Sequence, residues 1–452
     1  MQGIEAMVYP LPEDILVRKC AGDLKGALAL IDIYLREERA PLLRERLELE
    51  KQRIARLPGD YPLSRDAALG MAQSAISGLT DEEFDALELS GDIQYIYIEG
   101  QKRYFKRFLP SLFKLRPDVA ARAGRQELPA RPLLDDAIAE LKRKGELAYK
   151  LRMRASLRIS DAAFKPSCYR VHMPLPARSA QQSELRLIDH SAGLRDVRGE
   201  DAPARTAFFE RDMSANEEFF VEYEYVNRVR LFDASQPARV LYPDEPAPCE
   251  DDLAEQPGHI VFSPYLRALA DSICQGKPDA LGRARAIYDY VTTHVRYSFM
   301  REYFLLPPIA EYVALGLKGD CGVQALLFIT LCRIAGIPAR WQSGLSATLT
   351  DAGCHDWAQF YVEGWGWLFA DCSFGGGARR AGSMERWDFY FGNLDPFRMV
   401  ANSRFQQQLE PRKEFARIDP YDNQTGECES AERALMGDEL DTECRVISAQ
   451  KL

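Results

Sequence analysis

The chain has 452 residues, of which 46% are hydrophobic and 28% are charged, an ordinary globular balance for about two to four domains. Its 58 basic and 68 acidic residues leave a net charge of −10. This charge argues against a general nucleic-acid binder, whose footprint is basic, and against electrostatic docking on anionic membranes.

No apolar stretch reaches the ~20 residues that span a bilayer. Residues 1–7 lack the basic start and apolar run of a signal peptide, so we expect a cytoplasmic protein. The ten cysteines contain no CxxC pair and the five histidines are scattered, which predicts free thiols and no metal site. The sequence predicts no cofactor.

Apolar residues recur at helical spacing over residues 13–58, which predicts two helices, with Pro41 in the first turn of the second. Residues 93–105 fit either a small hairpin or the start of another helix. Two prolines within residues 128–132 indicate a boundary. We therefore assign residues 1–130 to a helical domain, which is also a candidate for binding a protein partner.

Residues 148–232 alternate apolar and polar side chains in short runs. This pattern predicts a β-sandwich-like domain over residues 131–245, opened by a helix from about 133 to 147. Residues 235–258 are rich in Pro, Asp and Glu and are typical of a linker.

The next domain is assigned to residues 246–400, where residues 280–295 predict a clear amphipathic helix. After residue 400 the chain becomes polar and acidic. Residues 401–452 are therefore expected to form a poorly ordered extension.

Cys321 is predicted to begin a buried helix. Asp320 is a good N-cap, the run 323–334 is apolar, and Gly336 follows it. At a helix N-terminus the free N–H groups and the dipole favour a thiolate, and the Cys321 N–H can serve as an oxyanion donor. The alternative is an inert buried thiol, because free cysteines are often buried.

His355 and Asp371 are predicted to lie on one hairpin. Residues 357–362 alternate along a strand that His355 opens, residues 363–366 form a turn, and Asp371 ends the return strand. Both side chains then lie near the same end of the hairpin, where a carboxylate–imidazole hydrogen bond can form.

These stretches together resemble the core of the transglutaminase-like superfamily, a branch of the papain-like cysteine enzymes, in its bacterial type. The resemblance covers about residues 280–375, with Cys321 and His355 34 residues apart and His355 and Asp371 16 apart. The matching positions are Gly319, Cys321, the run 331–340, Gly344, the run 355–361, Gly364, Trp365 and Asp371.

The sequence patterns and the resemblance together predict an α+β multidomain protein. A helical N-terminal region and a β-sandwich-like middle domain would precede a papain-like transglutaminase core. The resemblance also implies roles for three residues: Cys321 as the nucleophile, His355 as the general base and acid, and Asp371 as the carboxylate that orients the imidazole.

Further residues are weaker candidates around this site. Tyr297 ends the segment before the catalytic helix, so it is a candidate second oxyanion donor, or simply a packed aromatic residue. Trp357, Gly375 and Gly376 are candidates for the substrate cleft, although residues 374–377 can equally form a flexible turn.

Two cysteines neighbour the predicted triad. Cys354 and Cys372 each adjoin a triad residue, on opposite strands of the hairpin. They are either a facing pair that could act as a redox switch or two unpaired packed thiols, as a reducing cytosol favours.

The sequence therefore predicts a cysteine-dependent amide or peptide hydrolase that acts on a peptide or protein amide through a thioester. The alternatives are a crosslinking protein-glutamine acyltransferase, which shares every residue of the triad, and a non-catalytic binding or scaffold module. No calcium loop of the EF-hand type is present, which argues against a calcium-switched crosslinker.

Overall fold

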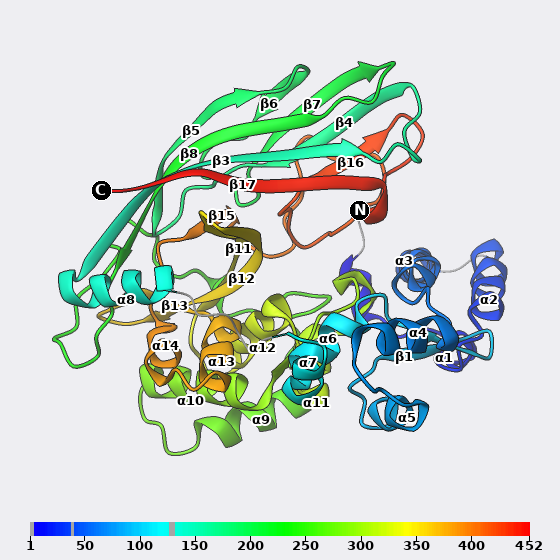
Figure 1. Cartoon of the computed structure of the whole chain (residues 1–452), viewed down its shortest axis with the longest axis horizontal. Coiled ribbons are helices and arrows are strands. Elements are labelled where there is room, and N and C mark those ends of the chain that lie inside the picture. The colour runs from blue at the N-terminus through cyan, green and yellow to red at the C-terminus, as the bar shows by residue number, and fades with distance from the viewer. Residues whose placement is uncertain (1–3, 38–39, 126–131) are drawn as a thin grey trace.

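The computed structural model describes residues 4–37, 40–125 and 132–452. Two stacked sheets lie at the top of Figure 1, a sheet flanked by helices lies beneath them, and a helical region lies at the right. The boundary expected at residues 128–132 falls almost wholly outside the described residues.

The helical region contains three helices where two were expected between residues 13 and 58. Gly22 adopts a φ of 79°, and Asp23 then caps a new helix by accepting the Gly26 amide at 2.8 Å. Residues 95–104 form a hairpin. The elements are η1 (Ile4–Val8), α1 (Glu13–Cys20), α2 (Leu24–Arg36), α3 (Pro41–Asp60), α4 (Arg65–Ala75), α5 (Asp81–Leu89), β1 (Tyr95–Ile98), β2 (Gln101–Tyr104), α6 (Phe108–Leu115) and α7 (Pro117–Arg122).

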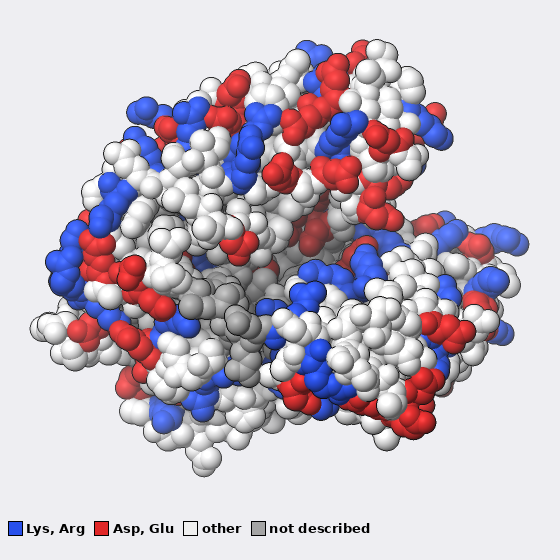
Figure 2. Space-filling model, viewed as in Figure 1, with Lys and Arg blue, Asp and Glu red and all other residues white. Residues whose placement is uncertain are grey.

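This region docks beside the segment that leads to Cys321. Arg53 donates to the carbonyls of Phe304 and Leu306, each at 2.8 Å, and Gln94 donates to the Ser298 hydroxyl at 2.9 Å. Figure 2 shows a hollow where the stacked sheets, the core and the helical region meet, with Lys and Arg gathered on the side of the helical region.

The stacked sheets are two antiparallel four-stranded layers, with strand orders β16-β4-β7-β6 and β17-β3-β8-β5. Alternate residues of their long strands share one hydrophobic cluster, as the alternation in the sequence predicts. The elements are α8 (Pro132–Lys144), β3 (Glu146–Ile159), β4 (Ser167–Pro174), β5 (Gln182–His190), β6 (Leu194–Val197), β7 (Thr206–Met213), β8 (Phe219–Arg230), β16 (Glu427–Ser430), η4 (Gly437–Glu439) and β17 (Leu440–Lys451).

The prediction of a poorly ordered extension after residue 400 was wrong. β16 pairs with β4, and β17 pairs along β3 from Leu440 opposite Ile159 to Lys451 opposite Tyr149. β17 is an edge strand whose side chains are mostly exposed, so it carries the polar composition that suggested disorder. The chain returns through this segment to complete both sheets.

The core is built on a five-stranded sheet of order β14-β13-β12-β11-β15, with α12 packed on β12, where the Phe328 and Phe360 rings lie 5.6 Å apart. Leu345 and Met399 of this sheet join the hydrophobic cluster of the stacked sheets. The elements are η2 (Glu250–Asp252), α9 (Pro264–Cys274), α10 (Ala280–His294), β9 (Arg296–Tyr297), η3 (Tyr303–Leu305), α11 (Ile309–Gly316), β10 (Lys318–Gly319), α12 (Cys321–Ile334), β11 (Ala339–Thr348), β12 (Asp351–Val362), β13 (Gly366–Ala370), α13 (Cys372–Arg380), α14 (Met384–Phe389), β14 (Phe391–Gly392) and β15 (Arg398–Asn402).

Within the ranges that the structure describes, no helix has both the length and the apolar character to cross a bilayer. The same residues contain no group of three or more His, Cys, Asp or Glu side chains placed to hold a metal ion.

Candidate active site

Cys321 is the first residue of α12, as its sequence context predicts. The Asp320 side chain accepts the Val323 amide at 3.3 Å, and residues 322–333 of the helix are buried. Cys321 itself is partly exposed. The helix therefore presents a thiol at its accessible end, anchored by a buried body.

The sulfur of Cys321 is hydrogen-bonded to Asp356 rather than to His355. Its Sγ lies 3.3 Å from Asp356 Oδ2, and Gln424 Nε2 donates to the other Asp356 oxygen at 2.7 Å. Successive residues of a strand point to opposite faces, so Asp356 is the β12 side chain that meets the thiol. No hydrogen bond joins Cys321 to His355 in the described chain.

The surroundings of Cys321 favour the neutral thiol. Burial, followed by the carboxylates of Asp356 and Asp320, raises the pKa of Cys321 well above its usual value. Burial also raises the pKa of Asp320 to about 6, against the opposing effect of a hydrogen bond from Tyr303. The helix N-terminus, which was expected to stabilise a thiolate, is here outweighed by desolvation and two acidic neighbours.

His355 and Asp371 form the pair that the hairpin predicts. His355 Nε2 lies 2.7 Å from Asp371 Oδ2, and both side chains are buried. β12 and β13 pair in register from Val362 opposite Gly366 to Ala358 opposite Ala370, which brings the two side chains to the same end. In the described chain His355 Nδ1 has no hydrogen-bond partner.

Both carboxylate oxygens of Asp371 have partners. Oδ1 accepts the Phe374 amide at 2.9 Å as the N-cap of α13, and Oδ2 contacts Arg398 Nη1 at 2.8 Å as well as His355. Burial opposes ionisation, but His355 and Arg398 outweigh it and hold the pKa of Asp371 well below its ordinary value. The carboxylate is therefore ionised beside the imidazole.

Tyr297 lies close to the thiol. It pairs with Gly319 across β9 and β10, two residues before Cys321. Burial, with Cys321 and Asp320 next, raises the pKa of Tyr297 far above its usual value, so its hydroxyl stays protonated and able to donate a hydrogen bond.

The three predicted cleft residues are packed inside the core. Trp357 is fully buried and donates its indole N–H to Gln342 Oε1 at 2.7 Å. Gly375 and Gly376 lie within α13, not in a turn. A Cβ on Gly375 would stand 1.8 Å from Tyr288 Oη, so these glycines allow α13 to approach α10 closely.

Cys354 and Cys372 are both free thiols. The pairing of Ala358 with Ala370 places Asp356, rather than Cys354, level with Cys372. Cys354 is exposed, whereas Cys372 is buried at the start of α13.

Sequence reasoning missed Asp356, Arg398, Asp395 and Gln424. Asp356 was visible as the neighbour of His355, but nothing in its position signalled a contact with Cys321. The other three follow the matched stretch and reach the site only through the tertiary fold.

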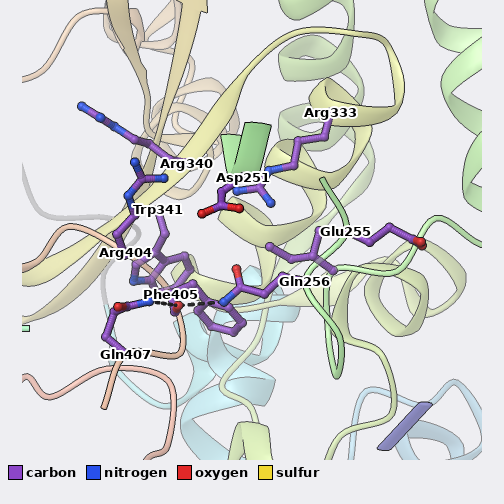
Figure 3. A pocket seen from close by; sticks show the side chains of 10 residues that line it. Asp251, Glu255, Gln256, Arg333, Arg340, Trp341, Arg404, Phe405 and Gln407 are labelled. Atoms are coloured by element: carbon purple, nitrogen blue, oxygen red, sulfur yellow. Dashed lines mark hydrogen bonds between the residues drawn. The ribbon is translucent and has the colours of Figure 1, made fainter. Parts of the chain in front are cut away.

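A cavity of about 220 Å³ lies at the other end of α12 (Figure 3). Arg333, near the last turn of α12, and Arg340 and Arg404 contribute to its lining. Arg340 pairs with Glu245 and Arg404 with Asp252. Because α12 is 14 residues long, or about 20 Å, this cavity is separate from the thiol site.

Residues 267–372 match the family described as the transglutaminase-like superfamily. Among solved structures, the chain is similar to a “putative cysteine protease” from Cytophaga hutchinsonii, with 15% identity, a TM-score of 0.42, and 67% of this chain and 91% of that chain covered. It is also similar to the periplasmic domain of TgpA from Pseudomonas aeruginosa, with 16% identity, a TM-score of 0.29, and 56% and 95% covered. The comparison with curated proteins found no match.

Proposed function

We propose that this protein, whose residues 267–372 form a transglutaminase-like core, is a cysteine-dependent amide or peptide hydrolase. The observation that carries the proposal is the buried His355–Asp371 pair at 2.7 Å, on a hairpin packed against the helix that Cys321 begins. A partly exposed thiol at a helix N-terminus and an oriented imidazole are the parts that thiol acyl transfer requires.

In the proposed reaction the Cys321 sulfur attacks the carbonyl carbon of an amide. The thiol proton passes to Nδ1 of His355, the nitrogen that Asp371 leaves free. The carbon–nitrogen bond then breaks as His355 returns the proton to the departing amine. Water attacks the resulting thioester and gives a proton to His355; the carbon–sulfur bond then breaks, His355 returns that proton to the Cys321 sulfur, and the acid is released.

Asp371 keeps the Nε2 proton of His355 in place, which leaves Nδ1 free to accept a proton, and its charge stabilises the imidazolium that forms transiently. The reaction also requires the Cys321 sulfur to leave Asp356 for His355. Hydrogen bonds of catalytic groups often tighten only when substrate is bound. The contact with Asp356 is therefore consistent with a resting form.

Mass spectrometry distinguishes the candidate activities. The protein is incubated with peptide mixtures that contain glutamine, with and without a primary amine, and products are compared with those of Cys321→Ala and of Cys20→Ala, an exposed cysteine elsewhere. Peptide cleavage, or conversion of glutamine to glutamate, that only Cys321→Ala abolishes supports the hydrolase. Amine incorporation favours the acyltransferase, and turnover by Cys321→Ala overturns both.

The scaffold alternative is tested with the same variants. A thiol-reactive probe that labels Cys321 no faster than the other exposed thiols, together with no turnover of any peptide, favours a binding module. In that case a partner of the helical region should bind wild type and Cys321→Ala equally well.

A further inference from the structure

A fully buried arginine contacts Asp371 of the His355–Asp371 pair. Arg398 in β15 has no exposed surface, and its Nη1 lies 2.8 Å from Asp371 Oδ2. Its Nε and Nη2 both donate to Asp395 Oδ2, at 3.0 and 2.6 Å. One guanidinium thus lies between two buried carboxylates, hydrogen-bonded to Asp395 and ion-paired with Asp371.

Aromatic rings surround the Arg398 guanidinium. The Arg398 guanidinium carbon lies 4.4 Å from the centroid of Phe374, 5.3 Å from that of Trp357 and 5.8 Å from that of Tyr390. The Phe374 ring also lies 4.4 Å from the His355 ring. The imidazole and the guanidinium therefore share one apolar wall, where charges interact more strongly than in water.

One oxygen atom connects the two cations. Asp371 Oδ2 is hydrogen-bonded to His355 Nε2 at 2.7 Å and forms an ion pair with Arg398 Nη1 at 2.8 Å. An arginine at this position holds the Asp371 side chain in one rotamer. It also adds a permanent positive charge that disfavours a second positive charge on the imidazole.

We propose that Arg398 is a positioning residue of this site, which fixes Asp371 for His355 and keeps the resting imidazole neutral, and so able to accept the thiol proton. The catalytic meaning of this role rests on the proposed function. The interaction with His355 does not depend on it.

The charges around His355 support this role. Burial lowers the pKa of His355, Asp371 raises it, Arg398 lowers it further, and Asp395 raises it, with a net shift downward. Asp356 is the next residue of β12 and contacts Cys321, while Tyr390 bonds to Asp395 and Cys372 follows Asp371 in the chain. Of these groups, Arg398 is the one that carries a fixed positive charge.

The test measures the protonation of His355 itself. Protein labelled at its histidines is titrated by NMR as wild type, Arg398→Met and Arg398→Lys, and the His355 signal is assigned from His355→Gln; Arg205→Met, which removes another buried arginine, is the control. We expect Arg398→Met to raise the pKa of His355 by about one unit, the scale on which one neighbouring charge acts. Arg398→Lys should raise it less, and the control should leave it unchanged.

Activity gives an independent readout. Where hydrolysis is found, the acidic limb of the kcat/KM profile of Arg398→Met should move to higher pH with the pKa of His355, which loss of packing alone would not cause. An unchanged pKa of His355 in Arg398→Met overturns the proposal. A raised pKa without hydrolysis by wild type supports this role and counts against the proposed function.

A double variant keeps the test informative if Arg398→Met does not fold. Arg398→Met leaves two carboxylates without their partner, and such a loss is costly in a core. If that variant does not fold, Arg398→Met/Asp395→Asn removes the Asp395 charge along with the guanidinium. The pKa of His355 should still rise, because the effect of Arg398 on it exceeds that of Asp395. A wild-type value in the double variant overturns the proposal.

Discussion

Cys321 and Asp356, 35 residues apart in the chain, meet at 3.3 Å between sulfur and Oδ2, while the neighbouring His355 pairs with Asp371. The contact is secured from the C-terminal segment, because Gln424 Nε2 donates to Asp356 Oδ1 and to the His355 carbonyl, at 2.7 and 3.2 Å. The structure therefore shows the thiol bound to the Asp356 side chain, which raises the pKa of Cys321, while burial and Asp422 raise the pKa of Asp356 itself well above its ordinary value.

Replacing that carboxylate should make the thiol more reactive. In Asp356→Asn the Cys321 pKa should fall by about one unit, because a nearby acidic group no longer disfavours the thiolate. Its alkylation by iodoacetamide should accelerate by about tenfold at the pH values where Asp356 of the wild type is ionised, which lie above the ordinary carboxyl range because burial raises the pKa of Asp356. Rates are measured by mass spectrometry of the Cys321 peptide across pH.

The matched control is Asp351→Asn, at the exposed start of β12, which should alkylate at the wild-type rate. An unchanged or slower rate in Asp356→Asn would show that the Asp356 carboxylate does not restrain the thiol.

The local part of this site was predictable from sequence. Asp320 as an N-cap and the alternation after His355 are signals carried by neighbouring residues, and they placed Cys321 at a helix start and His355 beside Asp371. The sequence did not predict that Cys321 would bond to Asp356 rather than to His355. This bond depends on how α12 lies across β12, which no local pattern encodes.

Two regions misled the prediction for physical reasons. Residues 374 to 377 were interpreted as part of a substrate cleft or a flexible turn, yet glycines 375 to 377 are helical, and Gly375 and Gly376 lie where α13 packs on α10. The charged residues of β17 indicated disorder because an edge strand exposes most of its side chains. In both places tertiary contact decides the structure.

The second prediction concerns Glu50, a buried acid in α3. It is fully buried and contacts Lys19, Arg46 and Arg53 at 2.5, 2.7 and 2.7 Å. Removing this one anion leaves three cations unpaired, so Glu50→Gln should lower the free energy of unfolding at pH 7 by about 3–5 kcal/mol. Urea denaturation measures the loss, with the exposed Glu48→Gln as the control.

The same group predicts a pH dependence. Burial opposes ionisation, but Arg53, Lys19 and Arg46 lower the pKa of Glu50 to about 2. Because the folded pKa lies below the unfolded one, this stabilisation is complete above about pH 5 and is lost as the pH falls towards 2. The difference in the free energy of unfolding between wild type and Glu50→Gln should therefore become smaller over that range. A difference that does not change with pH would show that the charge of Glu50 is not its cause.

The third prediction concerns β17. Deleting residues 437–452 removes the strand that pairs along β3 from Tyr149 to Ile159, and leaves the backbone groups of β3 unpaired at a sheet edge. We expect a lower melting temperature and self-association through the exposed edge, measured by thermal denaturation and size-exclusion chromatography. Deletion of residues 451–452 alone is the control, and full-length behaviour of the longer deletion would contradict the role of β17.

The last prediction uses two glycines of α13 as a matched pair. A Cβ on Gly375 would stand 1.8 Å from Tyr288 Oη, whereas a Cβ on Gly377 meets nothing within 4 Å. Both positions are helical, so alanine has the same advantage in helix propensity, about 1 kcal/mol, at each. Gly377→Ala should therefore raise the melting temperature, while Gly375→Ala should lower it, because overpacking costs about 1–3 kcal/mol. The Gly375 variant should also lose activity, since Asp371, the N-cap residue just before α13, holds His355. Equal effects of the two substitutions would show that the packing of α13 against α10 does not position the His355–Asp371 pair.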